Sequence, residues 1–299
     1  MRRDVIVMFA LWNLAGMPAV GAQDDPKKVE TQSKGTPKEQ FQKVLDAYQE
    51  AQRDFSQAYS KAQTNEERSK IAREKYPKSD EYARRFLAIA DAAPDDPAAV
   101  DALIWYIQIQ LGRGDDTSKA MKQLAEKHAA DPRLARLFSK LAHSNSPSGE
   151  ALLRAVIEKN RDRAARGNAT MALARFLKNR GDVITALRGN DKQRRQIENV
   201  LSSREGFDEA ALARLKATDP TALAKDIESL FEKVTKEFAD VSVGRATLGQ
   251  QADGELNDIR ILGVGKPCPE IVGEDIDGKP FKLSDYMGKV VVVDFWGDW

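Results

Sequence analysis

The sequence predicts a mainly α-helical N-terminal domain followed by a short C-terminal segment of β-strand character. Apolar residues recur at helical spacing from Glu39 to about Phe238. Charged residues make up 31% of the 299-residue chain and aromatic residues only 7%, which is typical of a soluble, helix-rich protein. After residue 259 the pattern changes to short β-branched runs separated by turn residues, as in β-strands.

The charge balance and the cysteine content argue against several kinds of site. The chain has 47 basic and 46 acidic residues, so no global field favours nucleic acid or an anionic membrane. Cys268 is the single cysteine, which rules out an intrachain disulfide. Together with His128 and His143 it shows no metal-ligand spacing. The spacing therefore predicts no metal site.

The N-terminus predicts export. Arg2 and Arg3 precede an apolar stretch, and small residues at Val20 and Ala22 mark a cleavage site before Gln23. This is the layout of a secretory signal over residues 1–22, and its apolar part is shorter than the ~20 residues of a membrane span. We expect a periplasmic or secreted protein without a stable membrane span after cleavage near Ala22. An uncleaved anchor is the alternative.

A polar linker and a long helical region follow. Residues 23–38 are polar and contain prolines and a glycine, which predicts a flexible linker. Residues 39–240 are expected to form the helical domain. Its first helix carries one apolar stripe, made by Phe41, Val44, Leu45, Tyr48 and Phe55. Breakers separate further expected helices, which are Asp80–Ala92, Ala98–Leu111, Ser118–Ala129, Leu134–His143, Glu150–Arg163 and Asn168–Asn179.

The helical region ends in one more helix and a connecting segment. The last helix is expected from about Pro220 to Phe238, with Thr218 or Asp219 as its N-cap and Pro220 at its first position. Residues 241–258 are rich in glycine and polar residues. They are expected to connect the helical domain to the C-terminal segment.

A faint internal repeat is present. Asp96-Pro97 and Asp131-Pro132 stand 35 residues apart, and each opens an expected helix. An apolar helix followed by Arg-Gly-Asp occurs twice, at residues 113–115 and 180–182. Helix pairs of this length build tetratricopeptide-like arrays, but the internal spacings of the two copies differ, so a helical domain without true repeats stays open. The glycines of both triplets are expected at helix C-caps, which argues against an adhesion motif.

Two further features have both a functional and a structural interpretation. Residues 154–195 hold 12 basic and 4 acidic side chains, and such a face is able to dock an acidic partner or phosphate groups. Solvated helix faces are the simpler interpretation, since aromatic stacking residues are nearly absent there. Trp105 and Tyr106 lie on an apolar helix and are expected in the core.

The C-terminal segment predicts a hairpin and a buried strand. Asp277-Gly278 lies between two extended runs, which is a strong hairpin signal. Residues 284–288 read as a turn or one helical turn. Val290–Val293 is an uninterrupted β-branched run, typical of a central strand buried on both faces.

The order of motifs in this segment resembles a known family. Gly-Lys-Pro-x-Pro begins at Gly265, a Gly-Glu-Asp-x-Asp-Gly-Lys hairpin begins at Gly273, and Leu-Ser-Asp-Tyr begins at Leu283. A Gly-Lys pair at 288–289 and a Val-Val-Val-Asp-Phe-Trp strand follow. Residues 259–299 thus resemble the opening of a redoxin domain of the TlpA-like and thiol-specific-antioxidant group of the thioredoxin superfamily. The resemblance implies the first hairpin and central strand of an incomplete α/β thioredoxin fold.

The resemblance also implies a site and its partners. Asp294 matches the buried aspartate of many thioredoxins, and Trp296 and Trp299 match aromatic residues that precede the Cys-x-x-Cys pair. In the family the first cysteine of that pair becomes a thiolate at a helix N-terminus and attacks disulfides. Its partners are protein thiols, protein disulfides or a redox partner protein, and the resemblance implies no organic or metal cofactor. This chain lacks both active-site cysteines, so we expect it to be inactive in disulfide exchange as given.

Cys268 does not replace the missing pair. It lies between two prolines, where the family usually has a small residue, so a packed or partly exposed role is expected, with a Cys268-linked dimer as a further expectation. Two other hypotheses remain: a non-catalytic helical interaction module with a vestigial redoxin segment, and a peroxidase that uses Cys268. Without neighbouring strands, Val290–Val293 should form an exposed apolar edge that associates.

Overall fold

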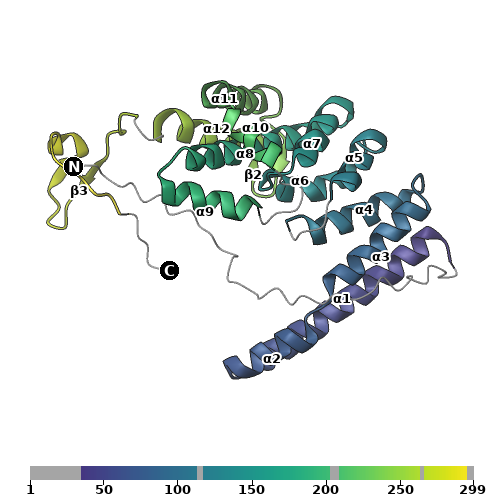
Figure 1. The fold of residues 1–299 in the computed structure, drawn as a ribbon. Coiled ribbons are helices and arrows are strands. Elements are labelled where there is room, and N and C mark those ends of the chain that lie inside the picture. Colours follow the sequence, from purple (N-terminus) through teal and green to yellow (C-terminus); the bar gives the residue numbers. More distant parts are fainter. Residues whose placement is uncertain (1–34, 113–116, 203–208, 263–265, 295–299) are drawn as a thin grey trace. The chain divides into compact units, whose positions relative to one another are not determined.

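The computed structural model describes residues 35–112, 117–202, 209–262 and 266–294, which are mostly helical with two small antiparallel hairpins (Figure 1). The expected signal peptide and nearly all of the expected linker lie outside the described residues. The helices are α1 (Pro37–Lys61), α2 (Asn65–Lys75), α3 (Ser79–Ala92), α4 (Pro97–Gln110), α5 (Ser118–Lys127), α6 (Ala135–Ala142), α7 (Pro147–Lys159), α8 (Arg163–Leu187), α9 (Asp191–Ser202), α10 (Glu209–Ala217), α11 (Pro220–Glu237) and α12 (Leu248–Asn257). Shorter elements are η1 (Pro132–Leu134), η2 (Asp258–Leu262), η3 (Leu283–Tyr286), β1 (Ser242–Val243), β2 (Ala246–Thr247), β3 (Val272–Glu274) and β4 (Pro280–Lys282).

N-cap side chains mark the residues at which many of the helices begin. Asp96 Oδ1 accepts a hydrogen bond from Ala98 N at 2.8 Å, and Asp131 Oδ1 accepts one from Arg133 N at 2.9 Å, so both Asp-Pro pairs open helical turns as expected. Asp219 caps α11 with Pro220 in its first turn, as predicted. These side chains satisfy backbone donors that a helix N-terminus otherwise leaves unpaired.

The helices pack against neighbours and next neighbours along the chain. α3 packs along α4, α5 along α7, and α6 and α7 along α8. The contacts between α5 and α7 and between α6 and α8 each join a helix to the next but one, and stacked helical units bury a shared core through such contacts. Whether these pairs form a tetratricopeptide array stays a prediction.

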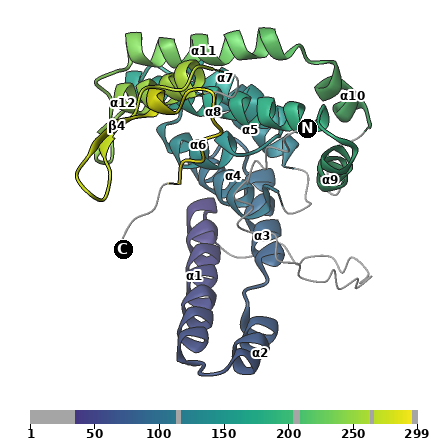
Figure 2. The ribbon, with the colours of Figure 1, turned by 90° about the vertical axis from the view of Figure 1, so that its left-hand side faces the viewer.

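Helix α8 is the centre of the second half of this core. It contacts α6, α7, α9, α11 and α12, and Figure 2 shows α11 and α12 close to it. One cluster of buried apolar side chains extends from Val44 in α1 to Leu256 in α12 and includes the fully buried Phe86, Phe176 and Phe231. Tyr106 belongs to this cluster, as expected, whereas Trp105 is only partly buried and packs against it.

Two parts of the helical region differ from the expectation. The predicted helix 168–179 is much longer, because α8 continues through Gly181, where a turn was expected. Ile184 and Leu187 beyond this glycine are buried, and their burial outweighs the ~1 kcal/mol that a helical glycine costs. The expectation that the glycine of Arg180-Gly181-Asp182 caps a helix is therefore wrong. The other triplet, residues 113–115, lies outside the described residues.

The expected connecting segment 241–258 contains structure that its composition does not indicate. α12 occupies most of it, and Leu248, Ala252 and Leu256 are buried against the shared core. A capping box between Thr247 and Gln250 begins this helix. The signal was present in the sequence, but the three glycines obscured it.

The C-terminal hairpin forms as predicted. β3 pairs with β4 in antiparallel register, with Gly273 opposite Phe281. Asp275 Oδ1 accepts hydrogen bonds from Asp277 N at 3.0 Å and from Lys279 N at 2.9 Å, and Gly278 has φ +74°. A left-handed residue at this position favours glycine. η3 follows, where a turn or a single helical turn was predicted.

The predicted buried central strand is wrong for the described residues. Val290–Val293 has no strand partner within the described chain, and all four side chains are exposed. A β-strand needs a neighbour for its backbone hydrogen bonds and a layer over its apolar side chains, and the described chain supplies neither.

Candidate functional site

The redoxin-like segment is organised around the turn that joins β4 to η3. Glu270 Oε1 accepts a hydrogen bond from Ser284 N at 3.0 Å, and Leu283 N donates to Ile271 O at 2.9 Å. The side chain of Ser284, and then its backbone N–H, lower the pKa of the Glu270 carboxyl. The Phe281 and Tyr286 rings meet edge to face at 6.4 Å. Residues 270–271, just before β3, are thus in direct contact with the Leu-Ser-Asp-Tyr motif at residues 283–286.

The predicted redox residues are not brought together. Cys268 is a free, exposed cysteine, and Asp294 is exposed. Trp296 and Trp299 lie outside the described residues, so their predicted roles stay predictions. In the ranges that the structure covers, no group of three or more His, Cys, Asp or Glu side chains is placed to hold a metal ion.

Several basic residues of the stretch 154–195 are paired with carboxylates. Arg180 Nη1 lies 2.7 Å from Glu150 Oε2, and Arg154 Nη2 lies 2.8 Å from Glu150 Oε1. Burial alone would raise the pKa of Glu150, but Arg180 and Arg154 together lower it below its ordinary value. Arg180 is only 19% exposed in its side chain and lies over the Phe176 ring at 4.7 Å, which is a favourable cation–π arrangement.

A second carboxylate pairs with two further basic side chains of α8. Glu255 of α12 binds Arg175 Nε at 2.9 Å and Lys178 Nζ at 2.6 Å. Burial alone would raise the pKa of Glu255. The combined effect of Lys178 and Arg175 is larger and lowers this pKa below its ordinary value. Arg163, at the start of α8, binds Asp240 at 2.6 Å. The excess of basic groups therefore tethers α8 to α7, α12 and the end of α11.

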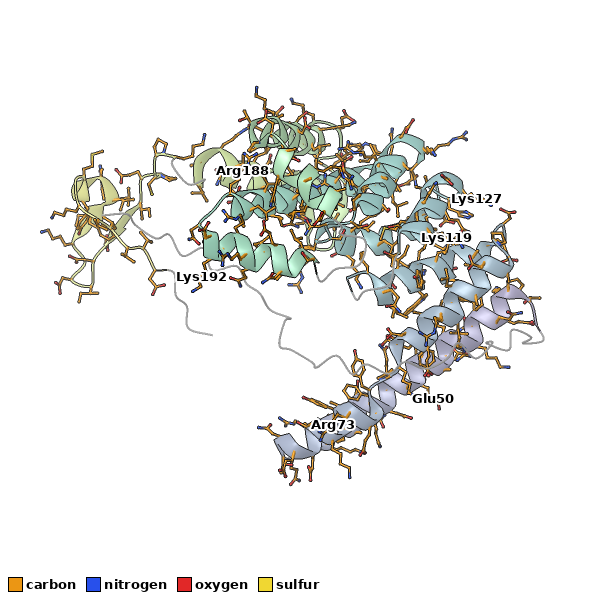
Figure 3. All side chains as sticks on the ribbon, in the orientation of Figure 1. Glu50, Arg73, Lys119, Lys127, Arg188 and Lys192 are labelled. Carbon is orange, nitrogen blue, oxygen red and sulfur yellow. The ribbon has the colours of Figure 1, made fainter. Side chains whose placement is uncertain are left out.

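Further basic side chains form hydrogen bonds or ion pairs that join the ends of different helices. Arg188 donates to the carbonyl of Thr218 at 2.9 Å. Lys119 and Lys127 of α5 pair with Asp91 at 3.3 Å and Asp95 at 2.9 Å near the end of α3. Figure 3 labels Arg188, Lys119 and Lys127 on these elements. Sequence reasoning missed these pairings, because the partners lie about 30 residues away along the chain.

Among the described residues, no helix combines the length and the apolar content that crossing a membrane requires.

Comparison with known proteins gives similarity over a short part of the chain. No family model matches it, and no solved structure gives a significant match. It is 42% identical over 38 residues to the thiol-disulfide oxidoreductase ResA of Geobacillus thermodenitrificans (strain NG80-2), which is 13% of this chain and 22% of that protein. It is 39% identical over 46 residues to ResA of Bacillus anthracis, covering 15% of this chain and 27% of that protein.

A further relative gives the same result. Thiol-disulfide oxidoreductase ResA of Geobacillus kaustophilus (strain HTA426) is 45% identical over 38 residues, or 13% of this chain and 22% of that protein. The chain therefore spans about a quarter of the length of the curated relatives it matches. A short part of this chain is similar to thiol-disulfide oxidoreductases.

Proposed function

We propose that the intact protein is an exported thiol-disulfide oxidoreductase in which a helical domain precedes a thioredoxin-like domain. The observation that carries the proposal is the ordered set of redoxin motifs from Gly265 onward, of which the hairpin and the Glu270–Ser284 closure are formed. The short similarity to ResA proteins supports the same assignment, and it is about as long as segment 259–299.

In this proposal the chemistry belongs to a Cys-x-x-Cys pair that this chain does not contain. The first thiolate of such a pair attacks a substrate disulfide and forms a mixed disulfide, and the second thiolate releases the reduced substrate. Two electrons and two protons pass from the dithiol to the substrate. Asp294 is then a residue that handles protons near the pair, and Trp296 and Trp299 lie beside it.

The chain of 299 residues is accordingly proposed to be inactive in disulfide exchange. The test is the reduction of insulin disulfides by dithiothreitol with the purified chain, compared with thioredoxin as a positive control. We expect a rate equal to the background. A rate above it that survives Cys268→Ser would overturn the assignment of the chemistry to a missing pair.

The proposed activity of the intact protein is tested by sequencing its gene and assaying the longer product. The coding locus should be sequenced through and beyond codon 299, and the longer product assayed. We expect Cys-x-x-Cys directly after Trp299, and insulin reduction that is abolished when the first of these cysteines becomes serine. A longer frame without a cysteine pair contradicts the proposed oxidoreductase.

A second candidate is a helical interaction module in which the redoxin segment is vestigial. It is favoured by one observation: the apolar core holds side chains from α1 to α12 and η2, and within the described chain it includes none from β3, β4 or η3. This candidate predicts capture of an exported protein partner that is the same with and without reductant. Capture that disappears in reductant favours the oxidoreductase instead.

A further inference from the structure

One basic side chain of α8 lacks the partner that its neighbours have. Four others on this helix pair with carboxylates, and they are Arg163, Arg175, Lys178 and Arg180. Arg166 is half-buried, and its Nε is buried without a hydrogen-bond acceptor. Within the described ranges, its guanidinium also forms no ion pair.

The backbone of Arg166 is held firmly in the fold. It is the fourth residue of α8, and its carbonyl accepts a hydrogen bond from the Thr170 hydroxyl at 2.8 Å. A Cβ atom added to the next residue, Gly167, would lie 2.9 Å from Leu248 Cδ1 and 2.9 Å from Phe238 Cγ. This end of α8 is therefore tightly packed, so the unpaired guanidinium does not result from a frayed helix end.

The carboxylates near this end of α8 are engaged elsewhere. Asp162 stands four residues before Arg166, a spacing at which ion pairs form along a helix. Its Oδ1 instead accepts a hydrogen bond from Ala165 N at 2.6 Å and caps the helix. Asp240 binds Arg163 at 2.6 Å. Within the described chain, neither carboxylate neutralises Arg166.

A charged group without a counter-charge is the most costly of the unpaired buried groups. The other such atoms in the described residues belong to the amides of Gln123 and Asn145 and to the imidazole of His128. One ordered water is able to satisfy an amide, whereas a cation taken out of water is strongly destabilising unless an anion accompanies it. The unpaired Nε of Arg166 therefore indicates an absent acceptor that carries negative charge.

We infer that Arg166 is the cation of a binding site for an oxyanion, which is a carboxylate or a phosphate group of a ligand. A guanidinium presents a planar fork of N–H donors that matches two oxygens of such a group. The N-terminal turn of a helix also favours a negative charge through the helix dipole. The inference is independent of the redox proposal, because Arg166 lies outside the redoxin-like segment.

The first test observes the Nε–H group of Arg166 directly. The full chain is labelled with ¹⁵N-arginine, and the Arg166 signal is assigned by its loss in Arg166→Lys. Sodium phosphate and sodium acetate are titrated separately at constant ionic strength. We expect a saturable shift of this signal, and a shift with phosphate only assigns a phosphate ligand, whereas a shift with acetate assigns a carboxylate. No shift with either anion, or an equal shift with sodium chloride, overturns the inference in favour of a bound water.

The second test measures what the unpaired guanidinium costs. Arg166→Met keeps much of the bulk of the side chain and removes its charge, so without an oxyanion this variant should unfold at a higher temperature than the parent chain. The parent chain should gain a few degrees in the oxyanion that shifts the signal, and Arg166→Met should not. This comparison is needed because phosphate stabilises many proteins without a specific site.

Arg161→Met is the matched control, since Arg161 is an exposed arginine five residues earlier. It should leave the unfolding midpoint unchanged and keep the gain with the oxyanion. If Arg166→Met unfolds at a lower temperature than the parent chain, the guanidinium has a structural role and the inference is overturned. An equal gain with the oxyanion in the parent chain and in Arg166→Met overturns it as well.

Discussion

At the scale of single residues, two glycines of α8 have very different surroundings. A Cβ atom added to Gly167 would lie 2.9 Å from Leu248 Cδ1 and 2.9 Å from Phe238 Cγ. A Cβ added to Gly181 would meet Leu223 Cδ2 at 3.7 Å and Ile227 Cδ1 at 3.8 Å, which is ordinary van der Waals contact. The first glycine allows close packing of α8, whereas the second only weakens the helix.

This contrast predicts opposite effects of the same substitution. Gly181→Ala should raise the free energy of unfolding by about 0.5–1 kcal/mol, because alanine reduces the freedom of the unfolded chain and fits the helix. Gly167→Ala should lower it by about 1–3 kcal/mol through overpacking. Urea unfolding followed by far-ultraviolet circular dichroism measures both. A loss of stability in Gly181→Ala would show that the helix is constrained at this position.

The exposed thiol of Cys268 gives a second prediction at this scale. Under oxidising conditions the purified chain should form a dimer that disappears with reductant, because an accessible thiol forms intermolecular disulfides when no second cysteine is present. Non-reducing electrophoresis measures the dimer, and Cys268→Ser is the control. A dimer of equal amount in that variant rules out the linkage.

At the scale of elements, α12 is held by both apolar and charged contacts. Leu248, Ala252 and Leu256 are buried, and Glu255 pairs with Arg175 and Lys178 of α8. The Glu255 side chain is only 19% exposed, so its ion pairs are less screened than those on the open surface. The helix thus joins the last part of the helical chain to its centre.

Glu255→Gln should lower the free energy of unfolding by about 1–3 kcal/mol, since two charge-assisted hydrogen bonds are weakened in a partly buried place. Lys122→Gln is the matched control. It removes an exposed pair with Glu126 at 3.9 Å, and its effect should stay within about 0.5 kcal/mol. Thermal unfolding of the two variants makes the comparison, and equal destabilisation contradicts a special role for Glu255.

The run Val290–Val293 is the second element with a testable consequence. Val292 is 88% exposed, and an apolar β-branched run without a neighbour strand is prone to association. Val292→Lys should reduce self-association with little change in the unfolding midpoint. Sedimentation velocity over a concentration series measures it. Association that is unaffected by the lysine would place the interface elsewhere.

At the scale of the whole molecule, three carboxylates stabilise the fold through their charged form. Arg133 lowers the pKa of Asp131 through a hydrogen bond. At Glu150 and Glu255 burial acts in the opposite direction, but the neighbouring basic groups lower the net pKa. A lowered pKa means that the unfolded chain binds more protons than the folded one, so stability rises with pH in the range where these groups titrate.

The free energy of unfolding should therefore be constant above about pH 5 and fall as the pH decreases below about 4.5, the ordinary range of glutamate. Urea midpoints measured between about pH 3.5 and 7 check the direction. Glu150→Gln removes one of these groups and should make the profile flatter at a lower overall stability. A midpoint that rises on acidification would contradict the lowered pKa values.

A feature could be predicted when the residues that cause it lie close together in the sequence. The first helix, the Asp219 cap and the Asp277-Gly278 hairpin were predicted because their causes lie within a few neighbouring residues. α2, α9, α10 and α12 were not predicted as helices. Of the candidate redox residues, Cys268 and Asp294 are located and exposed, and the structure brings neither to a site, because the groups that would surround them are not in the described chain.

The sequence by itself determined the helical class, the capping pairs, the hairpin and the absence of a second cysteine. Only the tertiary structure decided that α8 passes through Gly181 and that its Arg163, Arg175, Lys178 and Arg180 are paired with carboxylates. The reason is physical: caps and turns depend on backbone groups a few residues apart, whereas Glu255 meets Arg175 across 80 residues and Tyr48 meets Trp105 only when α1 packs on α4. Such contacts form through packing, which local composition does not specify.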